Sequence, residues 1–159
     1  MPILTASGRI VIAESIEARP IHLAWGLGDG AWTTPPSEDS THTSLINEIG
    51  RLKASEVAYV VLDPTGDINT PTGIYKRSVT PTNSMLLGFN FDFDNASSSV
   101  IREIAVFVGC TTNPALPGGQ TYFVPADIVA SGRLLHLENL APIFRSPSIR
   151  ENFQIVITF

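Results

Sequence analysis

One stretch of the chain alternates strictly between aromatic and polar residues. In residues 88–94, Phe89, Phe91 and Phe93 are separated by asparagine and aspartate. Because side chains of a β-strand point to opposite faces in turn, this order places the three rings on one face and the polar groups on the other. We therefore expect residues 88–94 to form a strand with one buried face.

The C-terminal residues 153–159 repeat this pattern. Their apolar positions are again two residues apart, so four large side chains would share one face of a strand. These positions are Phe153, Ile155, Ile157 and Phe159. Two shorter apolar runs, residues 58–62 and 104–108, are rich in residues that favour strands over short helices, and we expect them to be buried strands. We expect residues 19–25 to form another strand.

Helical signals are fewer. Residues 44–53 follow a serine- and threonine-rich segment that can supply an N-cap, and their apolar residues recur at spacings of four and three. Glu48 and Arg51 would lie on neighbouring turns of this helix. Residues 127–132 fit one further turn that ends on glycine. The pattern predicts an α+β fold, mostly antiparallel sheet with one or two short helices.

Composition and charge restrict the classes of function that the chain can have. At 159 residues the chain is expected to form a single structural domain over residues 1–159. Only 16% of its residues are charged, against about 25% in a typical soluble domain, and low charge suits a subunit of an assembly. The net charge of −5 argues against a nucleic-acid partner. We see no membrane span or secretory signal, so we expect synthesis in the cytoplasm.

No residue cluster argues for catalysis, a cofactor or a metal. Gly28-Asp29-Gly30 lacks the lysine and hydroxyl that follow in a phosphate loop, so we interpret it as a turn. Asp92 and Asp94 lack the glycine and glutamate of a calcium loop, and we interpret them as a solvated strand face. Cys110 is the only cysteine, and we expect it to be a small buried hydrophobe. The histidines do not group at metal-ligand spacing; they are His22, His42 and His136.

The order of several short motifs resembles a known family. Leu4-Thr5-Ala6-Ser7-Gly8 is followed by an expected strand, then by Gly28-Asp29-Gly30, then by Asn47-Glu48. Arg102-Glu103-Ile104 precedes a phenylalanine-containing strand, and residues 137–143 precede the last strand. This order is similar to that of the N-terminal domain of tail-collar fibre and baseplate-attachment proteins of bacteriophages. The resemblance implies a helix over residues 9–16, although Ile10, Val11 and Ile12 favour a strand by propensity.

The resemblance implies a structural protein of the phage virion. Family members often continue into a long fibre, whereas this chain ends at Phe159, so we expect a baseplate or collar subunit that docks fibres or spikes. It would be made in the bacterial host cytoplasm, and its partners would be other tail subunits and its own copies. It would act without a cofactor, a nucleic acid or a membrane. The expected interface residues are Trp25, Trp32, Phe153, Ile155, Ile157 and Phe159.

A different class of function stays open from the sequence. Trp25, Trp32 and Tyr122 are aromatic residues of the kind that stack on sugar rings. If they lie together on the surface beside polar side chains, the chain would be a carbohydrate- or receptor-binding module of a tail fibre. An enzyme would instead need titratable residues that converge in a pocket.

Overall fold

The computed structural model describes residues 1–159 and divides them into two compact units. Each unit is assembled from separate segments of the chain. Unit 1 comprises Met1–Arg19, Ala54–Phe89 and Asn152–Phe159. Unit 2 comprises Pro20–Lys53 and Asn90–Glu151.

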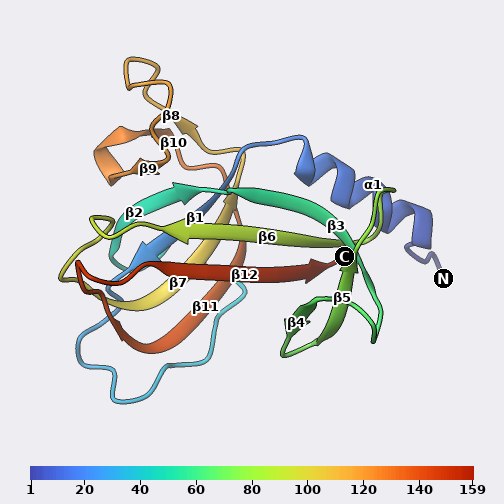
Figure 1. Cartoon of the computed structure of the whole chain (residues 1–159), viewed down its shortest axis with the longest axis horizontal. Coiled ribbons are helices and arrows are strands. Elements are labelled where there is room, and N and C mark those ends of the chain that lie inside the picture. Colours follow the sequence, from blue (N-terminus) through green and yellow to red (C-terminus); the bar gives the residue numbers. More distant parts are fainter. The chain divides into compact units, whose positions relative to one another are not determined.

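Unit 1 contains one helix and a five-stranded sheet with the order β12-β6-β3-β5-β4 (Figure 1). Its core includes Val60, Ile68, Tyr75 and Leu86, with Val156 packed against them. The last two residues of β6 and the first residue of β12 already belong to unit 2. The elements are α1 (Ala6–Glu17), β3 (Glu56–Leu62), β4 (Ile68–Thr70), β5 (Gly73–Arg77), β6 (Ser84–Phe91) and β12 (Glu151–Thr158).

Unit 2 is built on a five-stranded sheet with the order β11-β7-β1-β2-β9, in which every neighbouring pair is antiparallel. One of its core clusters contains Ala24, Leu45, Ala105 and Phe107. The strands are β1 (Ile21–Gly26), β2 (Glu48–Lys53), β7 (Val100–Val108), β9 (Tyr122–Phe123) and β11 (Arg133–Phe144). A two-stranded sheet and a 3-10 turn complete the unit: β8 (Thr111–Thr112), β10 (Ile128–Ala130) and η1 (Pro125–Asp127).

The predicted fold class is confirmed, since 45% of the residues are in strands, mostly antiparallel, and 9% are helical. The strands expected from residues 19–25, 58–62, 104–108 and 153–159 are present as β1, β3, β7 and β12. The helix implied over residues 9–16 is α1, and the hydroxyl of its N-cap Thr5 accepts a hydrogen bond from the Gly8 N–H at 3.1 Å. No helix combines the length and the apolar character that crossing a bilayer requires.

The helix predicted over residues 44–53 is wrong, because the second half of that segment is β2. Pairing with β1 overrides the helical spacing, and Leu52 lies opposite Leu23 in the sheet. The register shifts beside Gly26, which pairs with Glu48 while Trp25 pairs with Gly50, so Ile49 is the extra residue of a bulge. The bulge brings Glu48 and Arg51 to the same side, where they form an ion pair at 2.6 Å.

The strand predicted over residues 88–94 is shifted by several residues. β6 begins at Ser84 and ends at Phe91, so Phe89 and Phe91 are fully buried whereas Phe93 is 41% exposed. A turn stops the strand, because the Asn95 side chain accepts from the Asp92 N–H at 2.8 Å and the Asn95 N–H donates to the Asp92 carbonyl at 3.2 Å. The one turn expected over residues 127–132 is instead largely the strand β10.

Candidate functional site

Four strand edges are available in the two large sheets, and three of them are short or covered. β4 has three residues and β9 has two, which is too little for a stable added strand. β11 is long, but its pairing with β7 is interrupted by two register shifts. A loop also covers it, because Asn139 donates from its backbone to Glu38 and from its side chain to the Pro36 carbonyl, both at 3.0 Å. These are the usual protections of exposed sheet edges.

The fourth edge, β12, is long and has no strand on its outer side. It is eight residues long and its only strand neighbour is β6. β12 runs antiparallel to β6, since the Phe159 N–H donates to the Asn83 carbonyl at 2.9 Å and the Thr158 and Ser84 hydroxyls are 2.8 Å apart (Figure 1). Along a strand, backbone groups point alternately to the two sides. The even-numbered residues of β12, Gln154 and Val156 among them, therefore direct their N–H and C=O groups to the open side.

The predicted interface residues of β12 lie on a sheet face and not along its edge. Phe153, Ile155, Ile157 and Phe159 are all half-buried. In the register set by Phe159 and Asn83, they lie across from odd-numbered positions of β6, and the β6 residues at 85, 87 and 89 are fully buried. The backbone of β12, more than these side chains, is therefore what the strand offers to a partner.

Trp25, another predicted interface residue, is buried within unit 2. Its exposed fraction is 0%, and its ring stacks on Phe91 with ring centroids 3.6 Å apart. The guanidinium of Arg145 lies 5.0 Å from the centre of the same ring. Trp25 therefore stabilises unit 2 from within, and its side chain is not at the surface of the chain.

Trp32 is half-buried in the loop between β1 and β2. The turn before it is held by Asp29, whose carboxylate accepts from the Ala31 N–H at 2.9 Å and whose carbonyl accepts from the Trp32 N–H at 3.1 Å. Gly28 has φ +58°, and a Cβ added there would lie 2.7 Å from the Trp32 ring. The expected turn is thus present, and its glycine is needed both for the backbone conformation and for the close approach of the ring.

Three of the motifs that carry the family resemblance meet in this loop region of unit 2: those around Gly28, Asn47 and Glu103. The buried Glu103 carboxylate accepts from the backbone N–H groups of Ile46 at 3.2 Å and Asn47 at 3.0 Å. Arg102 donates to the Leu27 carbonyl at 3.3 Å. These contacts anchor both ends of the long loop that carries Trp32. The motifs therefore hold a loop in place, and Asn47-Glu48 leads into β2, not into the helix predicted over residues 44–53.

Arg145 is the functional residue that sequence reasoning missed. Its guanidinium is fully buried and donates to the backbone carbonyls of Asp92 at 2.8 Å, Asn95 at 3.3 Å and Ile149 at 3.0 Å. Its backbone N–H also donates to the Ser99 carbonyl at 2.9 Å. One side chain therefore joins the loop after β6 to the loop after β11. Nothing in the local sequence signals this, since Asp92 and Asn95 lie about fifty residues earlier along the chain.

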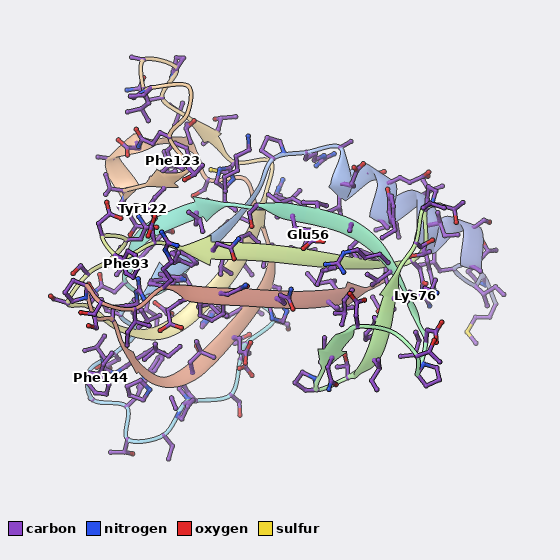
Figure 2. All side chains as sticks on the ribbon, in the orientation of Figure 1. Glu56, Lys76, Phe93, Tyr122, Phe123 and Phe144 are labelled. Atoms are coloured by element: carbon purple, nitrogen blue, oxygen red, sulfur yellow. The ribbon has the colours of Figure 1, made fainter.

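The two loops joined by Arg145 present exposed apolar and cationic side chains. Phe93, Phe144 and Ile149 are 41%, 74% and 50% exposed, and Figure 2 labels the two phenylalanines. Arg150 stacks its guanidinium 4.6 Å from the centre of the Phe93 ring and donates to Asp92 at 2.9 Å. Aromatic residues and arginine are the types enriched at protein interfaces. The tip of unit 2, made of Phe93, Phe144 at the end of β11, Ile149 and Arg150, thus has residue types that are common at protein interfaces.

The remaining sequence-predicted positions are structural. Cys110 is buried as expected, and its burial raises the pKa of its thiol. Tyr122 is half-buried, with its ring 6.3 Å from that of Phe91 in an edge-to-face arrangement, and burial raises its pKa. No group of three or more histidine, cysteine or acidic side chains is arranged to hold a metal ion.

An open strand edge, an anchored tryptophan loop and an exposed apolar tip are the candidate contact surfaces of the chain. The comparisons with known proteins place it more closely. The whole chain, residues 1–159, matches the model of the family described as "baseplate wedge 3 tail fiber network component", and the chain belongs to that family. A search of curated proteins found no match. The resemblance to phage baseplate and tail-fibre proteins is thereby confirmed, and it implies a location in the virion tail.

Proposed function

We propose that this chain is an adaptor of the baseplate that docks fibre or spike subunits onto the tail machinery. The observation that carries this proposal is the open edge of β12, an eight-residue strand with a strand neighbour on one side only. A strand donated by a partner subunit would pair with the outward backbone groups of β12 by β-augmentation. The exposed tip of unit 2 and Trp32 would supply separate side-chain contacts.

Mechanistically, such an adaptor needs permanent contacts and no chemistry. Permanent interfaces commonly bury more than about 2,000 Å² in total, and main-chain pairing along an eight-residue strand contributes both area and register to such a contact. The partners would be other tail subunits, copies of this chain among them. We propose no catalytic role, because the family is a structural component of the baseplate.

The arrangement of the aromatic residues supports an adaptor over a carbohydrate-binding module. Sugar-stacking sites need aromatic faces that are open to solvent. Trp25 is 0% exposed, and the half-buried Tyr122 packs edge-on to Phe91. Two of the three rings that could stack on a sugar, those of Trp25 and Tyr122, therefore pack on Phe91 inside unit 2.

The test compares two variants at one exposed position of β12. Gln154→Pro removes an outward N–H and places a proline ring on the open side, while the hydrogen bonds of the odd-numbered residues to β6 stay in place. Gln154→Ala keeps the N–H and is the matched control. We expect particles assembled with the proline variant to lose fibres or spikes in electron micrographs, and those with the alanine variant to keep them. Normal particles with the proline variant would remove the proposal, provided that the purified variant shows the same circular dichroism as the parent.

A further inference from the structure

A cavity of about 430 Å³ lies in unit 2 beside the loop that follows β8, and its size is within the range of ligand pockets. Its apolar walls include Pro20, Leu116 and Phe123; Phe123, labelled in Figure 2, comes from β9. Its polar walls include His22, Lys53 and Cys110. His22 and Lys53 lie opposite each other on β1 and β2, so the two side chains are neighbours on the sheet.

The buried imidazole of His22 lacks a hydrogen-bond partner on one nitrogen. Only 3% of the residue is exposed, and Nδ1 is buried without a donor or acceptor beside it. Buried polar groups are nearly always paired, because an unpaired one costs about 1–3 kcal/mol. Nδ1 itself is closed to solvent, so His22 meets the cavity with the rest of its ring.

Lys53 is the only residue on the cavity wall that is charged at neutral pH. Burial, together with the positive charges of Arg51 and Lys53, lowers the pKa of His22 to about 4, so the imidazole is neutral. Burial raises the pKa of the Cys110 thiol, which is neutral as well. No aspartate or glutamate lines the cavity, and Lys53 forms no ion pair. In a chain with net charge −5, the cavity is thus a local site of positive potential.

Two carboxylates of unit 2 pair with other groups. Glu48 forms its ion pair with Arg51. The Asp127 carboxylate accepts from the side chain of Gln120 at 3.2 Å and from the backbone N–H of Val124 at 3.1 Å. Neither carboxylate pairs with Lys53, so its ammonium can pair with an anionic ligand.

We propose that this cavity binds a carboxylate side chain carried by a segment of a partner polypeptide. One carboxylate oxygen pairs with the ammonium of Lys53, the other accepts a hydrogen bond from the imidazole of His22, and apolar neighbours of the acidic residue pack on Leu116 and Phe123. This rests on the proposed function, and it adds a side-chain anchor in unit 2 to the strand pairing at β12. A carboxylate fits better than a phosphate, because a single cation faces the cavity.

The test is an NMR titration of the isotope-labelled full chain with two matched peptides, acetyl-Leu-Glu-Leu-amide and acetyl-Leu-Gln-Leu-amide. We expect saturable shifts of the amides around the cavity with the glutamate peptide, and at least about tenfold weaker binding of the glutamine peptide. Lys53→Gln should cause a similar loss, whereas Lys53→Arg should retain binding. Lys53 is exposed, so neither substitution removes a core contact.

Three results would overturn the inference: no saturable shifts, equal binding of the two peptides, or unchanged binding by the Lys53→Gln variant. The same titration is repeated with sodium acetate. Binding of acetate as tightly as the glutamate peptide would show a site for a free small anion and would also overturn the inference. The adaptor proposal is tested at Gln154, in unit 1, so failure of either experiment leaves the other interpretable.

Discussion

The guanidinium of Arg145 lies 5.0 Å from the centre of the Trp25 ring, and both side chains are buried in unit 2. A buried cation is stable only when its donors are satisfied, and here backbone carbonyls of two loops accept them. The Glu151 carboxylate, 3.7 Å away, balances the charge. The pair therefore couples the core of the unit to the loops that carry its exposed apolar tip.

Replacement of Arg145 by methionine should destabilise the chain strongly. It leaves carbonyls of Asp92, Asn95 and Ile149 without their donor, and we expect the free energy of unfolding to fall by about 3 kcal/mol. Urea denaturation followed by tryptophan fluorescence measures this. Arg150→Met is the control, because Arg150 is 67% exposed and its pair with Asp92 is worth less than about 1 kcal/mol. Equal losses in the two variants would contradict the assigned role of Arg145.

Gly28→Ala should destabilise the loop that carries Trp32. Gly28 has φ +58°, and the added methyl group would lie 2.7 Å from the tryptophan ring. We expect a loss of about 1–3 kcal/mol in the free energy of unfolding and altered NMR shifts of the Trp32 indole. Gly30→Ala is the matched control, since no atom lies within 4 Å of its added Cβ and its φ is not positive. If both variants behave like the parent, Gly28 does not fix the ring.

Stability should fall as the pH is lowered from about 6.5 to about 4, in part through His22. The pKa of His22 is about 4 in the folded chain and 6.5 when exposed, so in this window the unfolded state binds a proton that the folded state does not. The loss amounts to about 3 kcal/mol across the window. Urea denaturation at pH 7, 6 and 5 measures it, and His22→Gln should flatten the dependence. The same slope in the variant would assign the effect to other groups.

Calorimetry tests the prediction that the chain forms a single domain. The chain passes between the two units at four points, and β6 and β12 each contain residues of both units. Neither unit is therefore a continuous piece that can be cut out of the chain. We expect one calorimetric unfolding transition, with equal van't Hoff and calorimetric enthalpies. Two separate transitions would show two independent domains.

Local patterns in the sequence predicted the strands well, and longer-range contacts explain where they did not. The alternation of apolar and polar residues in 153–159 predicted a strand with one buried face, and these residues lie in β12 and at its end. Residues 44–53 have helical spacing, but β2 formed because its residues pair with β1, which lies about thirty residues earlier. Alternation continued past Phe91 in the sequence, whereas the hydrogen bonds between Asp92 and Asn95 ended the strand.

The candidate site was predictable only in part. The apolar positions of β12 were visible, but its open edge depends on which strands flank it in the sheet. Trp25 was expected at an interface, and its burial comes from Phe91 and Arg145, which are distant in sequence. The cavity beside His22 combines residues from β1, β2 and the loop after β8, and no local pattern brings these together.

The most direct test of the account is the cryo-electron microscopy structure of the intact baseplate at a resolution that traces strands. We predict that a strand from a neighbouring subunit pairs with the outer edge of β12, with hydrogen bonds to the backbone of Gln154 and Val156. An edge that faces solvent in the assembled baseplate, or one covered by a helix without main-chain pairing, would contradict the account.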